Sequence, residues 1–428
     1  MTSNVAVAGT TRGSVHGFTG WASRLSVERL AVGAAAVVIA LLPLLRPAGP
    51  RSTAPVDALM VLALLAALLW LGGTHRAIRF PYALPVGLFL LGGALGAISG
   101  PIPGAGAVAL VQDIALLLWF WALINIGSSA ERLQVIVRVW AYAAIGWAVL
   151  LLGSLAAGIS AISGQTASEG VRTALTFGNP NYAGNYFFVS IMIVWAAGRP
   201  RGRVARLAGY AVLLAALVST GSNGALIALA VATFVAGLVG LYRRAGLVAA
   251  TTAVAGVVLA AACVTWKYDV EDVQSRASQS KYAFIRDGVG RSEKTASDRG
   301  VLARQGFDLY RAGGPLGTGP GSTKVRLKDE NANRAVEAHN DYLAAVNERG
   351  VIGLLGVLFL LTGVSLQALS LVRAPAGAAF ARAIVRPNAL VGAVAGTLVA
   401  MTATEYLHVR HVWTLFAVVV AAALVARK

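Results

Sequence analysis

Long apolar runs, separated by short polar connections, recur from one end of this chain to the other. Most are close to the roughly 18–20 residues that an α-helix needs to span a lipid bilayer. Gly and Pro are frequent within them, which lipid-embedded helices tolerate better than soluble ones. The pattern predicts an all-α polytopic membrane protein with about twelve transmembrane helices, near residues 30–45, 56–73, 82–99, 105–127, 133–158, 181–198, 207–221, 224–242, 247–266, 351–372, 388–409 and 411–426.

The composition supports this interpretation. Of the 428 residues, 57% are hydrophobic and only 13% are charged, whereas roughly 25% of the residues of a soluble domain are charged. The formal net charge of +18 could indicate nucleic-acid binding, but Lys and Arg lie mostly in the short connections, where they set membrane topology. The single cysteine, Cys263, lies inside an apolar run, which excludes an internal disulfide and a thiolate metal cluster.

The distribution of Lys and Arg predicts the orientation. If the N-terminus is cytoplasmic, the inner segments hold seventeen basic residues and the short outer connections hold four, namely Arg46, Arg51, Arg172 and Arg410. Cytoplasmic segments carry the excess of basic residues, so both termini are predicted to be cytoplasmic. The chain then divides into a cytoplasmic tail (1–28), nine helices (29–266), a large extracytoplasmic loop (267–345) and three helices (346–428).

The loop of residues 267–345 interrupts the pattern because it is polar and too long for a turn. Fourteen basic and twelve acidic residues between positions 267 and 349 nearly balance its charge. Long loops in compact proteins are usually functional lids or binding regions. The spacing of apolar residues over 297–313 predicts an amphipathic helix on the outer face, and the Gly/Pro-rich stretch 313–321 predicts a tight turn back towards the membrane.

The richest candidate chemistry lies at the end of this loop. His339 precedes an amphipathic run that merges into a predicted transmembrane helix, so its expected place is the outer interface. The ordinary pKa of a histidine is close to the working pH, so its side chain can accept a proton from a sugar hydroxyl. The alternative is a helix-capping or interfacial histidine, which is the more common role of a lone His.

A second candidate is a stretch in which Asn179, Pro180 and Asn181 precede a predicted helix and Arg172 lies a few residues earlier. The free N–H groups and the positive dipole end of a helix start suit a phosphate. Taken alone, however, Asn-Pro-Asn is simply a helix-start signal, and that interpretation competes with the functional one.

Two further polar stretches lie at the same predicted face. Residues 219–225 form a polar break between two apolar runs, which an ordinary hairpin turn also explains. Glu405, His408, Arg410 and His411 crowd the junction of the last two predicted helices. Ionisable residues at membrane depth are costly and by default mark a functional site, although an ion pair between Glu405 and Arg410 would be a structural explanation.

Together these residues resemble the motifs of the O-antigen ligase and O-antigen polymerase superfamily, polytopic inverting glycosyltransferases with a GT-C-like membrane fold. The superfamily hallmark is a His, often followed by Asn, and a Gly-x-x-Gly that is separated from the His by ten residues. Here His339-Asn340 precedes Gly350 and Gly353, and Glu348 supplies the acidic residue before the first Gly. A preceding Gly-x-Gly-Pro-Gly element corresponds to residues 317–321. The likeness covers roughly residues 130–410.

One departure concerns the lipid pyrophosphate of the donor. Superfamily members often carry a Ser-Arg pair at the outer end of a mid-chain helix, and that Arg is thought to bind the pyrophosphate. The corresponding pair here is Ser222-Asn223. Asparagine can hydrogen-bond a phosphate but cannot neutralise it, so either another base, such as Arg410 or a loop Arg between positions 286 and 311, replaces it, or the donor differs.

The resemblance implies a transferase of the bacterial inner or plasma membrane that needs no metal and no cofactor. It would move a glycan from a polyprenyl-diphosphate carrier, such as undecaprenyl diphosphate, to a hydroxyl of a membrane-anchored acceptor on the outer face. His339 is expected to be the base or the acceptor-orienting group, and Asp341 or Glu348 would position it or the acceptor.

The predicted diphosphate site consists of Arg172 and Arg410, because arginine binds phosphate oxygens bidentately. The remaining predicted binding residues are Asn179, Asn181, Asn223, Asn340 and Glu405.

Three alternatives stay open at the level of sequence. Ligase and polymerase share all these features, and the sequence does not identify the acceptor. A secondary transporter or lipid-linked flippase also fits twelve spans, but transporters usually place ionisable groups near the membrane midplane, whereas here they gather at one face. A non-catalytic envelope scaffold is the third, and the Ser222-Asn223 departure is its best argument.

Overall fold

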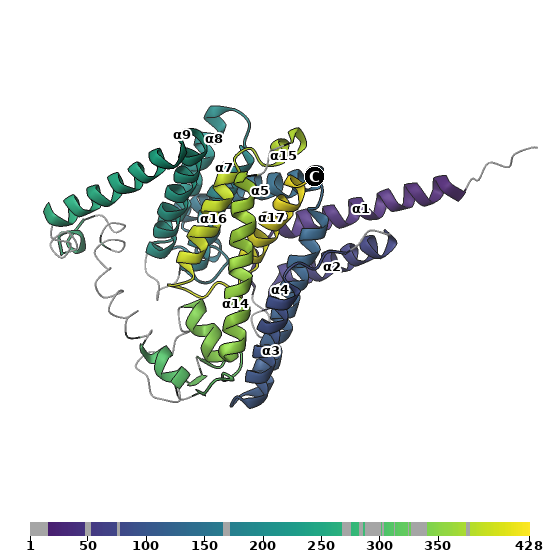
Figure 1. Cartoon of the computed structure of the whole chain (residues 1–428), viewed down its shortest axis with the longest axis horizontal. Helices are drawn as coiled ribbons and strands as arrows, with labels where there is room; N and C mark the ends of the chain where they lie inside the picture. The colour runs from purple at the N-terminus through teal and green to yellow at the C-terminus, as the bar shows by residue number, and fades with distance from the viewer. Residues whose placement is uncertain are drawn as a thin grey trace, which may run out of the picture.

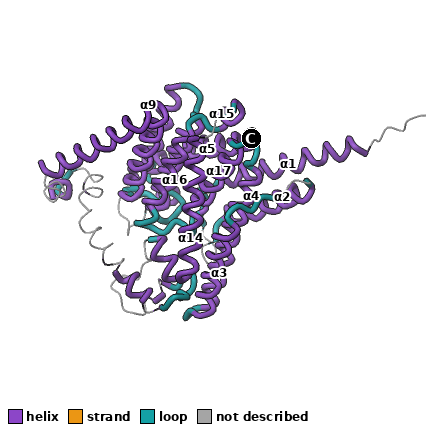
Figure 2. The backbone as a smooth tube through the Cα atoms, in the orientation of Figure 1, coloured by secondary structure: helices purple, strands orange, loops and turns teal. Residues whose placement is uncertain are grey.

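A computed structural model of the chain is α-helical and without strands over the residues that it describes (Figures 1 and 2). These are residues 16–47, 53–74, 78–165, 172–267, 275–281, 286, 301, 304–311, 313–323, 325–326, 340–373 and 377–428. The helices are α1 (His16–Ala40), α2 (Pro55–Gly73), α3 (Ala83–Ser99), α4 (Pro103–Ile126), α5 (Ala130–Ala156), α6 (Ser160–Ser163), α7 (Pro180–Ala197), α8 (Arg203–Ser219), α9 (Asn223–Lys267), α14 (Asp341–Arg373), α15 (Ala378–Ala383), α16 (Pro387–Ala400) and α17 (Arg410–Ala426).

Each predicted apolar run overlaps one of these helices, and the all-α fold is confirmed. By length and composition, α2, α4, α5, the Asn223–Ala260 part of α9 and α14 can cross a membrane, which makes five candidate spans. The apolar helices α3, α16 and α17 are shorter. The total of twelve spans stays a prediction.

The run expected over residues 388–409 is too long. The helix that it predicted, α16, ends at Ala400, and residues 401–409 form a series of turns before α17 begins. The reason is chemical, because Thr402, Thr404 and Glu405 bring polar groups into this stretch. The backbone N–H groups of Tyr406 and Leu407 bond to the carboxylate of Asp341 on α14 rather than continuing a helix.

Two of the longest helices are interrupted by glycines. Gly246 divides α9 (φ 79°), and Gly350 divides α14 (φ 63°). These left-handed backbone conformations cost a glycine little because it has no Cβ. The break in α9 falls between the two apolar runs predicted there, and the break in α14 separates a short N-terminal part from the long apolar helix that follows.

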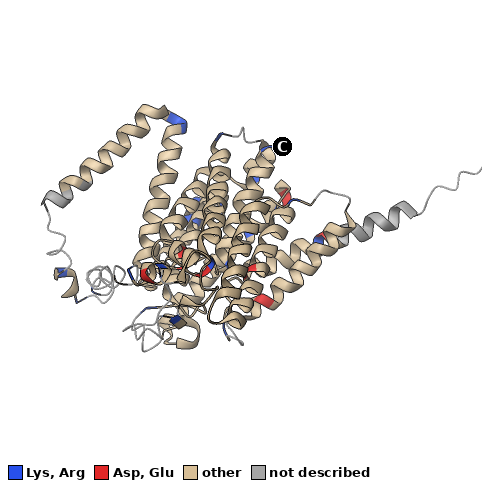
Figure 3. Cartoon of the chain, turned by 60° about the horizontal axis from the view of Figure 1, so that its bottom comes forward, with Lys and Arg blue, Asp and Glu red and all other residues tan. Residues whose placement is uncertain are grey.

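Large apolar side chains cover much of the outside of the bundle. Leu69 on α2 is 68% exposed and Val248 on α9 is 78% exposed. The long middle parts of the helices carry few charged residues, which lie mainly near the helix ends and connections (Figure 3). Exposing such a surface to water would be unfavourable, whereas lipid accommodates it. The fold is therefore that of a multi-pass membrane protein.

Inside the bundle, α7 and α17 are buried along almost their whole length. Polar side chains link the inner helices. The indole N–H of Trp119 donates to Thr414 Oγ1 at 3.0 Å, and that of Trp140 donates to Ser190 Oγ at 3.0 Å. Such interhelical hydrogen bonds satisfy polar groups that have no access to water in a membrane interior.

Successive connections along the chain lie alternately at one end of the bundle and at the other. At one end, Leu45 N donates to Thr176 Oγ1 (3.4 Å) and Thr173 N to Ser219 O (3.1 Å). At the other, Asn125 Nδ2 donates to Arg79 O (2.9 Å). We call these the outer and inner ends, after the predicted topology. The alternation is what that topology requires, and the side of the membrane that each end faces stays a prediction.

Part of the large loop is described. Within the helix predicted over residues 297–313, residues 304–311 are helical. Leu309 is buried, whereas Phe307 is exposed and lies under the guanidinium of Arg311, 4.6 Å from its ring centroid. Most of the loop lies outside the described residues, and its place outside a membrane stays a prediction.

Helices α3 and α14 pack backbone against backbone. Gly92 and Gly96 lie one turn apart on α3, where a Cβ at Gly92 would collide with the backbone of Gly353 and one at Gly96 with the carbonyl of Glu348. Small residues allow helix backbones in membranes to approach this closely. A Cβ at Gly350 would in turn collide with the carbonyl of Pro315.

The segment 313–323 closes this contact through backbone hydrogen bonds. Thr318 N donates to Asn347 O at 2.9 Å, Gly319 N to Glu348 O at 2.9 Å, and Val351 N to Pro315 O at 3.0 Å. The Gly-x-Gly-Pro-Gly element and the Gly-x-x-Gly of α14 therefore touch each other. Their glycines are explained by close packing around the start of α14.

The α3–α14 contact predicts that one added methyl group destabilises the protein at Gly96 but not at Gly87. Gly96→Ala should lower the midpoint of thermal unfolding in detergent, because overpacking against backbone costs roughly 1–3 kcal/mol. Gly87→Ala, on the same helix, is the matched control, since a Cβ at Gly87 has no neighbouring atom within 4 Å. Fluorescence-detected unfolding of the two variants checks this, and equal midpoints would contradict the described packing.

Candidate functional site

A cluster of polar groups from distant parts of the chain lies at the outer end, centred on Asn181. Arg172 Nη2 donates to Asn181 Oδ1 at 3.0 Å, and Arg172 Nε donates to the carbonyl of Thr220 at 3.0 Å. Ser222 Oγ donates to the same Asn181 Oδ1 at 3.1 Å. We call Arg172, Asn181, Thr220 and Ser222 the Arg172 cluster. The structure thus brings together Arg172, Asn181 and the 219–225 stretch.

The Arg172 cluster is held by the turn between α8 and α9. Thr173 N donates to Ser219 O at 3.1 Å, and the hydroxyls of the two residues lie 2.9 Å apart. Gly221 has a φ of 60°, and a Cβ there would lie 3.1 Å from Arg172 Cγ. The stem of Arg172 therefore lies across this turn, directly beside Ser222 and next to Asn223, the first residue of α9.

Asn179 acts as a helix cap. Its side chain accepts a hydrogen bond from Asn181 N at 2.8 Å, and Pro180 occupies the first helical position of α7. Both are standard ways of beginning a helix. The capping interpretation of Asn-Pro-Asn is therefore correct for Asn179, while Asn181 directs its side chain to Arg172 and Ser222.

The turn before α17 is attached to the start of α14 by a buried carboxylate. Asp341 is 2% exposed, and it accepts hydrogen bonds from Tyr406 N at 2.7 Å and Leu407 N at 2.9 Å. The N–H of Asp341 donates to Met401 O at 2.9 Å. Hydrogen bonds to a charged acceptor are among the stronger ones in proteins. Asp341 therefore positions the turn, a role that the sequence analysis had not assigned to it.

Tyr406 connects this turn to the Arg172 cluster, because its hydroxyl donates to Asn181 O at 3.3 Å. Nearby, Tyr182 and His408 pair through the phenol oxygen and Nε2 at 2.8 Å. His411 lies deeper and is buried, with Nε2 2.8 Å from Asn185 Oδ1. His411 is thus a core residue, whereas His408 is exposed at the outer end.

His339 lies outside the described residues, but its neighbour Asn340 is described. The side chain of Asn340 caps α14 by accepting from Tyr342 N at 2.9 Å and from Leu343 N at 3.1 Å. Its Nδ2 donates to Thr402 O at 3.1 Å. The residue that follows His339 is therefore attached to the same turn that reaches the Arg172 cluster through Tyr406.

Arg410 lies apart from the Arg172 cluster. Its Nε and Nη2 bind both carboxylate oxygens of Asp57 on α2, and the two side chains are 17% and 32% exposed. Asp57 also accepts from Ala54 N at 2.8 Å at the start of α2. The carboxylate that pairs with Arg410 is therefore Asp57 and not Glu405, and the pair links α2 to α17.

Side-chain contacts of Glu348 and Arg349 hold the start of α14 in place. Thr323 Oγ1 donates to Glu348 Oε1 at 2.8 Å, which holds the 313–323 segment against the helix. Arg349 forms an ion pair with Asp113 on α4 at 2.9 Å and lies 4.2 Å from the ring centroid of Phe89 on α3. The sequence analysis had given Asp113 no role, although a lone acidic residue in an apolar run was a usable signal.

Metal ligation is not a feature of the part of the chain that the structure describes. Among those residues, His, Cys, Asp and Glu do not gather in any group of three or more that could hold a metal ion. The Arg172 cluster consists of a guanidinium, an amide and hydroxyls, which are groups that hydrogen-bond anionic or polyhydroxylated ligands.

The described part of the chain is therefore a helical membrane bundle with a cluster of polar groups at one end. Residues 208–358 match the family model described as O-antigen ligase, so the resemblance to that superfamily is confirmed. The matched segment includes Ser222-Asn223, His339-Asn340 and the Gly-x-x-Gly of α14. It indicates a glycosyltransferase-like enzyme that transfers glycans at a membrane. No curated protein matched the chain.

The role of Asp341 predicts a local effect of removing its charge. Asp341→Asn leaves only one acceptor oxygen for two N–H groups, and each hydrogen bond to a charged group contributes roughly 1.5–3 kcal/mol. The amides of Tyr406 and Leu407 should therefore exchange about tenfold faster or more in hydrogen–deuterium exchange mass spectrometry. Asp308→Asn, an exposed carboxylate of the large loop, is the control. Unchanged exchange in Asp341→Asn would contradict this role.

The pairing of Arg410 predicts a non-additive double variant. Arg410→Ala and Asp57→Ala should each lower stability by up to about 1 kcal/mol, because the pair is partly exposed to solvent. The double variant should unfold at a temperature no lower than the worse single variant, since both remove the same interaction. Thermal unfolding in detergent measures this, and simple additivity would show that the two side chains act independently.

Proposed function

We propose that this protein is a membrane glycosyltransferase of the O-antigen ligase or polymerase type. It transfers a glycan from a polyprenyl-diphosphate carrier to a hydroxyl of a membrane-anchored acceptor at the outer end. The observation that carries the proposal is the O-antigen ligase match over residues 208–358, whose motif residues lead into the turn that contacts the Arg172 cluster. The membrane is the bacterial inner or plasma membrane, and the outer end faces away from the cytoplasm.

In this proposal Arg172 supplies the positive charge that is missing at Ser222-Asn223. Its guanidinium lies across the 220–222 turn, bonded to Thr220 O, so it stands beside the position where superfamily members carry an Arg. Asn181 orients it from the other side. Arginine binds the oxygens of a diphosphate well because its planar fork donates several hydrogen bonds in fixed geometry.

Arg410 is the weaker of the two predicted phosphate ligands. The carboxylate of Asp57 already occupies the edge of its guanidinium that a diphosphate would use. Binding a donor there would require breaking this bidentate pair. We therefore assign diphosphate binding to Arg172, with Asn181, Asn223 and Asn340 as neutral hydrogen-bonding residues around it.

The proposed reaction is a single displacement at the anomeric carbon. The acceptor hydroxyl attacks, the bond between the anomeric carbon and the phosphate oxygen breaks, and the polyprenyl diphosphate leaves. His339 takes the hydroxyl proton or orients the hydroxyl, and Arg172 stabilises the charge that develops on the leaving diphosphate. Attack from the face opposite the leaving group inverts the configuration, and the activated sugar–phosphate bond makes ATP unnecessary.

The proposal predicts the phenotype of two substitutions in a strain that lacks the native gene. His339→Ala should reduce glycan transfer by about 10²- to 10⁴-fold, the usual contribution of a general acid–base group. Arg172→Lys keeps a positive charge but loses the two-sided bonding to Asn181 and Thr220, and it should also lose most transfer. Mature surface glycan and lipid-linked glycan are quantified together after equal expression is verified.

Arg373→Ala is the control, because Arg373 is exposed at the inner end of α14. A transferase defect leaves the lipid-linked donor on the outer leaflet, whereas a defect in a flippase leaves it on the inner leaflet. Inner-leaflet accumulation would support transport instead, and wild-type glycan in both site variants would favour a scaffold. The length of the transferred glycan separates polymerase from ligase.

A further inference from the structure

A cavity of about 470 Å³ lies at the inner end, on the side of the bundle opposite the Arg172 cluster. It is formed where α2 and α4 end and where α17 is followed by the last residues. Its lining residues are Trp70, Leu71, Arg79, Asn125, Ser128, Ser129 and Lys428. Among the side chains that line it, those of Arg79 and Lys428 are cationic and none is acidic, so these side chains favour an anion.

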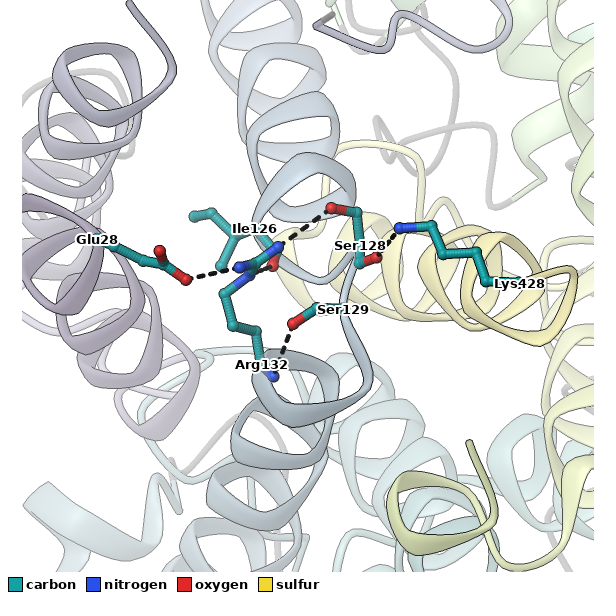
Figure 4. A network of polar contacts seen from close by, with 6 residues as sticks. All are labelled: Glu28, Ile126, Ser128, Ser129, Arg132 and Lys428. Carbon is teal, nitrogen blue, oxygen red and sulfur yellow. Dashed lines mark hydrogen bonds and ion pairs between the residues drawn. The ribbon is translucent and has the colours of Figure 1, made fainter. Parts of the chain in front are cut away.

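One wall of the cavity is a rigid polar network (Figure 4). Arg132 Nη1 bonds to Glu28 Oε1 at 2.6 Å, its Nε donates to Ile126 O at 2.5 Å, and its Nη2 donates to Ser128 Oγ at 3.3 Å. The guanidinium also lies 5.0 Å from the ring centroid of Trp70. Glu28 balances the charge of Arg132, which therefore braces the wall rather than offering a free cation.

The two lining cations are held differently. Lys428 Nζ donates to Ser128 O at 2.9 Å, which places the ammonium group at the rim. The backbone of Arg79 is clamped by Asn125, since Arg79 N donates to Asn125 Oδ1 and Asn125 Nδ2 donates to Arg79 O, both at 2.9 Å. Within the described residues the Arg79 guanidinium has no hydrogen-bond or ion-pair partner. Because its backbone is held in place and its guanidinium has no partner among the described residues, Arg79 can bind an anion without giving up another interaction.

We propose that this cavity binds a phosphate group, carried by the headgroup of an anionic phospholipid. Arg79 and Lys428 bind the phosphate oxygens, and the Ser128 hydroxyl, whose oxygen accepts from Arg132, donates its hydrogen to them. Basic pockets between helix ends on the cytoplasmic side of membrane proteins bind such headgroups. Trp70 and Leu71 give the cavity an apolar side, and the preceding residue on α2, Leu69, is 68% exposed.

The apolar side distinguishes a lipid from a free phosphate ion. A soluble phosphate uses only the charged and hydroxyl groups, whereas a phospholipid also places its glycerol and first acyl carbons against Trp70 and Leu71. Leu69 on α2 is already suited to acyl chains. The cavity is independent of the transferase proposal, because none of its residues belongs to the Arg172 cluster.

The experiment measures lipid binding to the full chain purified in detergent, by native mass spectrometry with added phosphatidylglycerol or phosphatidylcholine. Arg79→Gln and Lys428→Gln should each weaken binding of phosphatidylglycerol roughly fivefold, the usual effect of one basic residue at a membrane surface, and the double variant more. Arg373→Gln, which changes an exposed inner-end cation that does not line the cavity, should bind as the wild type does. The midpoint of thermal unfolding, measured in parallel, verifies that every variant is folded.

A second arm identifies the source of the phosphate. Inorganic phosphate and glycerol 3-phosphate are added as competitors. If neither displaces phosphatidylglycerol at millimolar concentration, the lipid is the ligand. If either displaces it fully and binds with similar affinity, the phosphate site stands but its ligand is soluble. Equal phosphatidylglycerol binding by all folded variants, or equal binding of phosphatidylcholine by the wild type, would overturn the proposal.

Discussion

The buried carboxylate of Asp341 accepts two backbone N–H groups of the turn before α17, and the geometry of the outer end follows from this bond pair. The turn carries Tyr406, whose hydroxyl reaches Asn181, and Asn181 in turn holds Arg172. A guanidinium on one loop is thereby positioned relative to the start of α14, although the two are far apart in sequence. Any ligand that binds Arg172 therefore meets a site whose parts are already connected.

The two ends of the bundle carry different kinds of chemistry. At the outer end the Asp57–Arg410 ion pair links two helices. Arg172 is hydrogen-bonded to the amide of Asn181 and the carbonyl of Thr220. At the inner end Arg132 is neutralised by Glu28, whereas Arg79 and Lys428 line a cavity without an acidic residue. This division is consistent with the two proposals, transfer from a lipid-linked donor at the outer end and binding of an anionic phospholipid at the inner end.

Local signals in the sequence predicted much of the fold. The apolar runs located the helices, Asn-Pro-Asn located the start of α7, and the gap between the runs at 224–242 and 247–266 located the break in α9. Contacts between residues that are far apart in the sequence could not be predicted. Asp57 and Arg410 are 353 positions apart, and nothing in either neighbourhood specifies the other. Arg172 was identified as a candidate by its charge, but its place beside Ser222 depends on how two loops fold together.

The packing of α3 on α14 restricts how this chain can change. A side chain added at Gly92 would meet backbone atoms of α14, and one added at Gly350 would meet backbone atoms of the 313–323 segment, in neither case another side chain. A second substitution cannot relieve such a clash, because no residue is smaller than glycine and the opposing atoms are common to all residues. Suppressor mutations are therefore unavailable for these positions. The Asp57–Arg410 pair differs, because substitutions at both positions can replace it with another pair of complementary side chains.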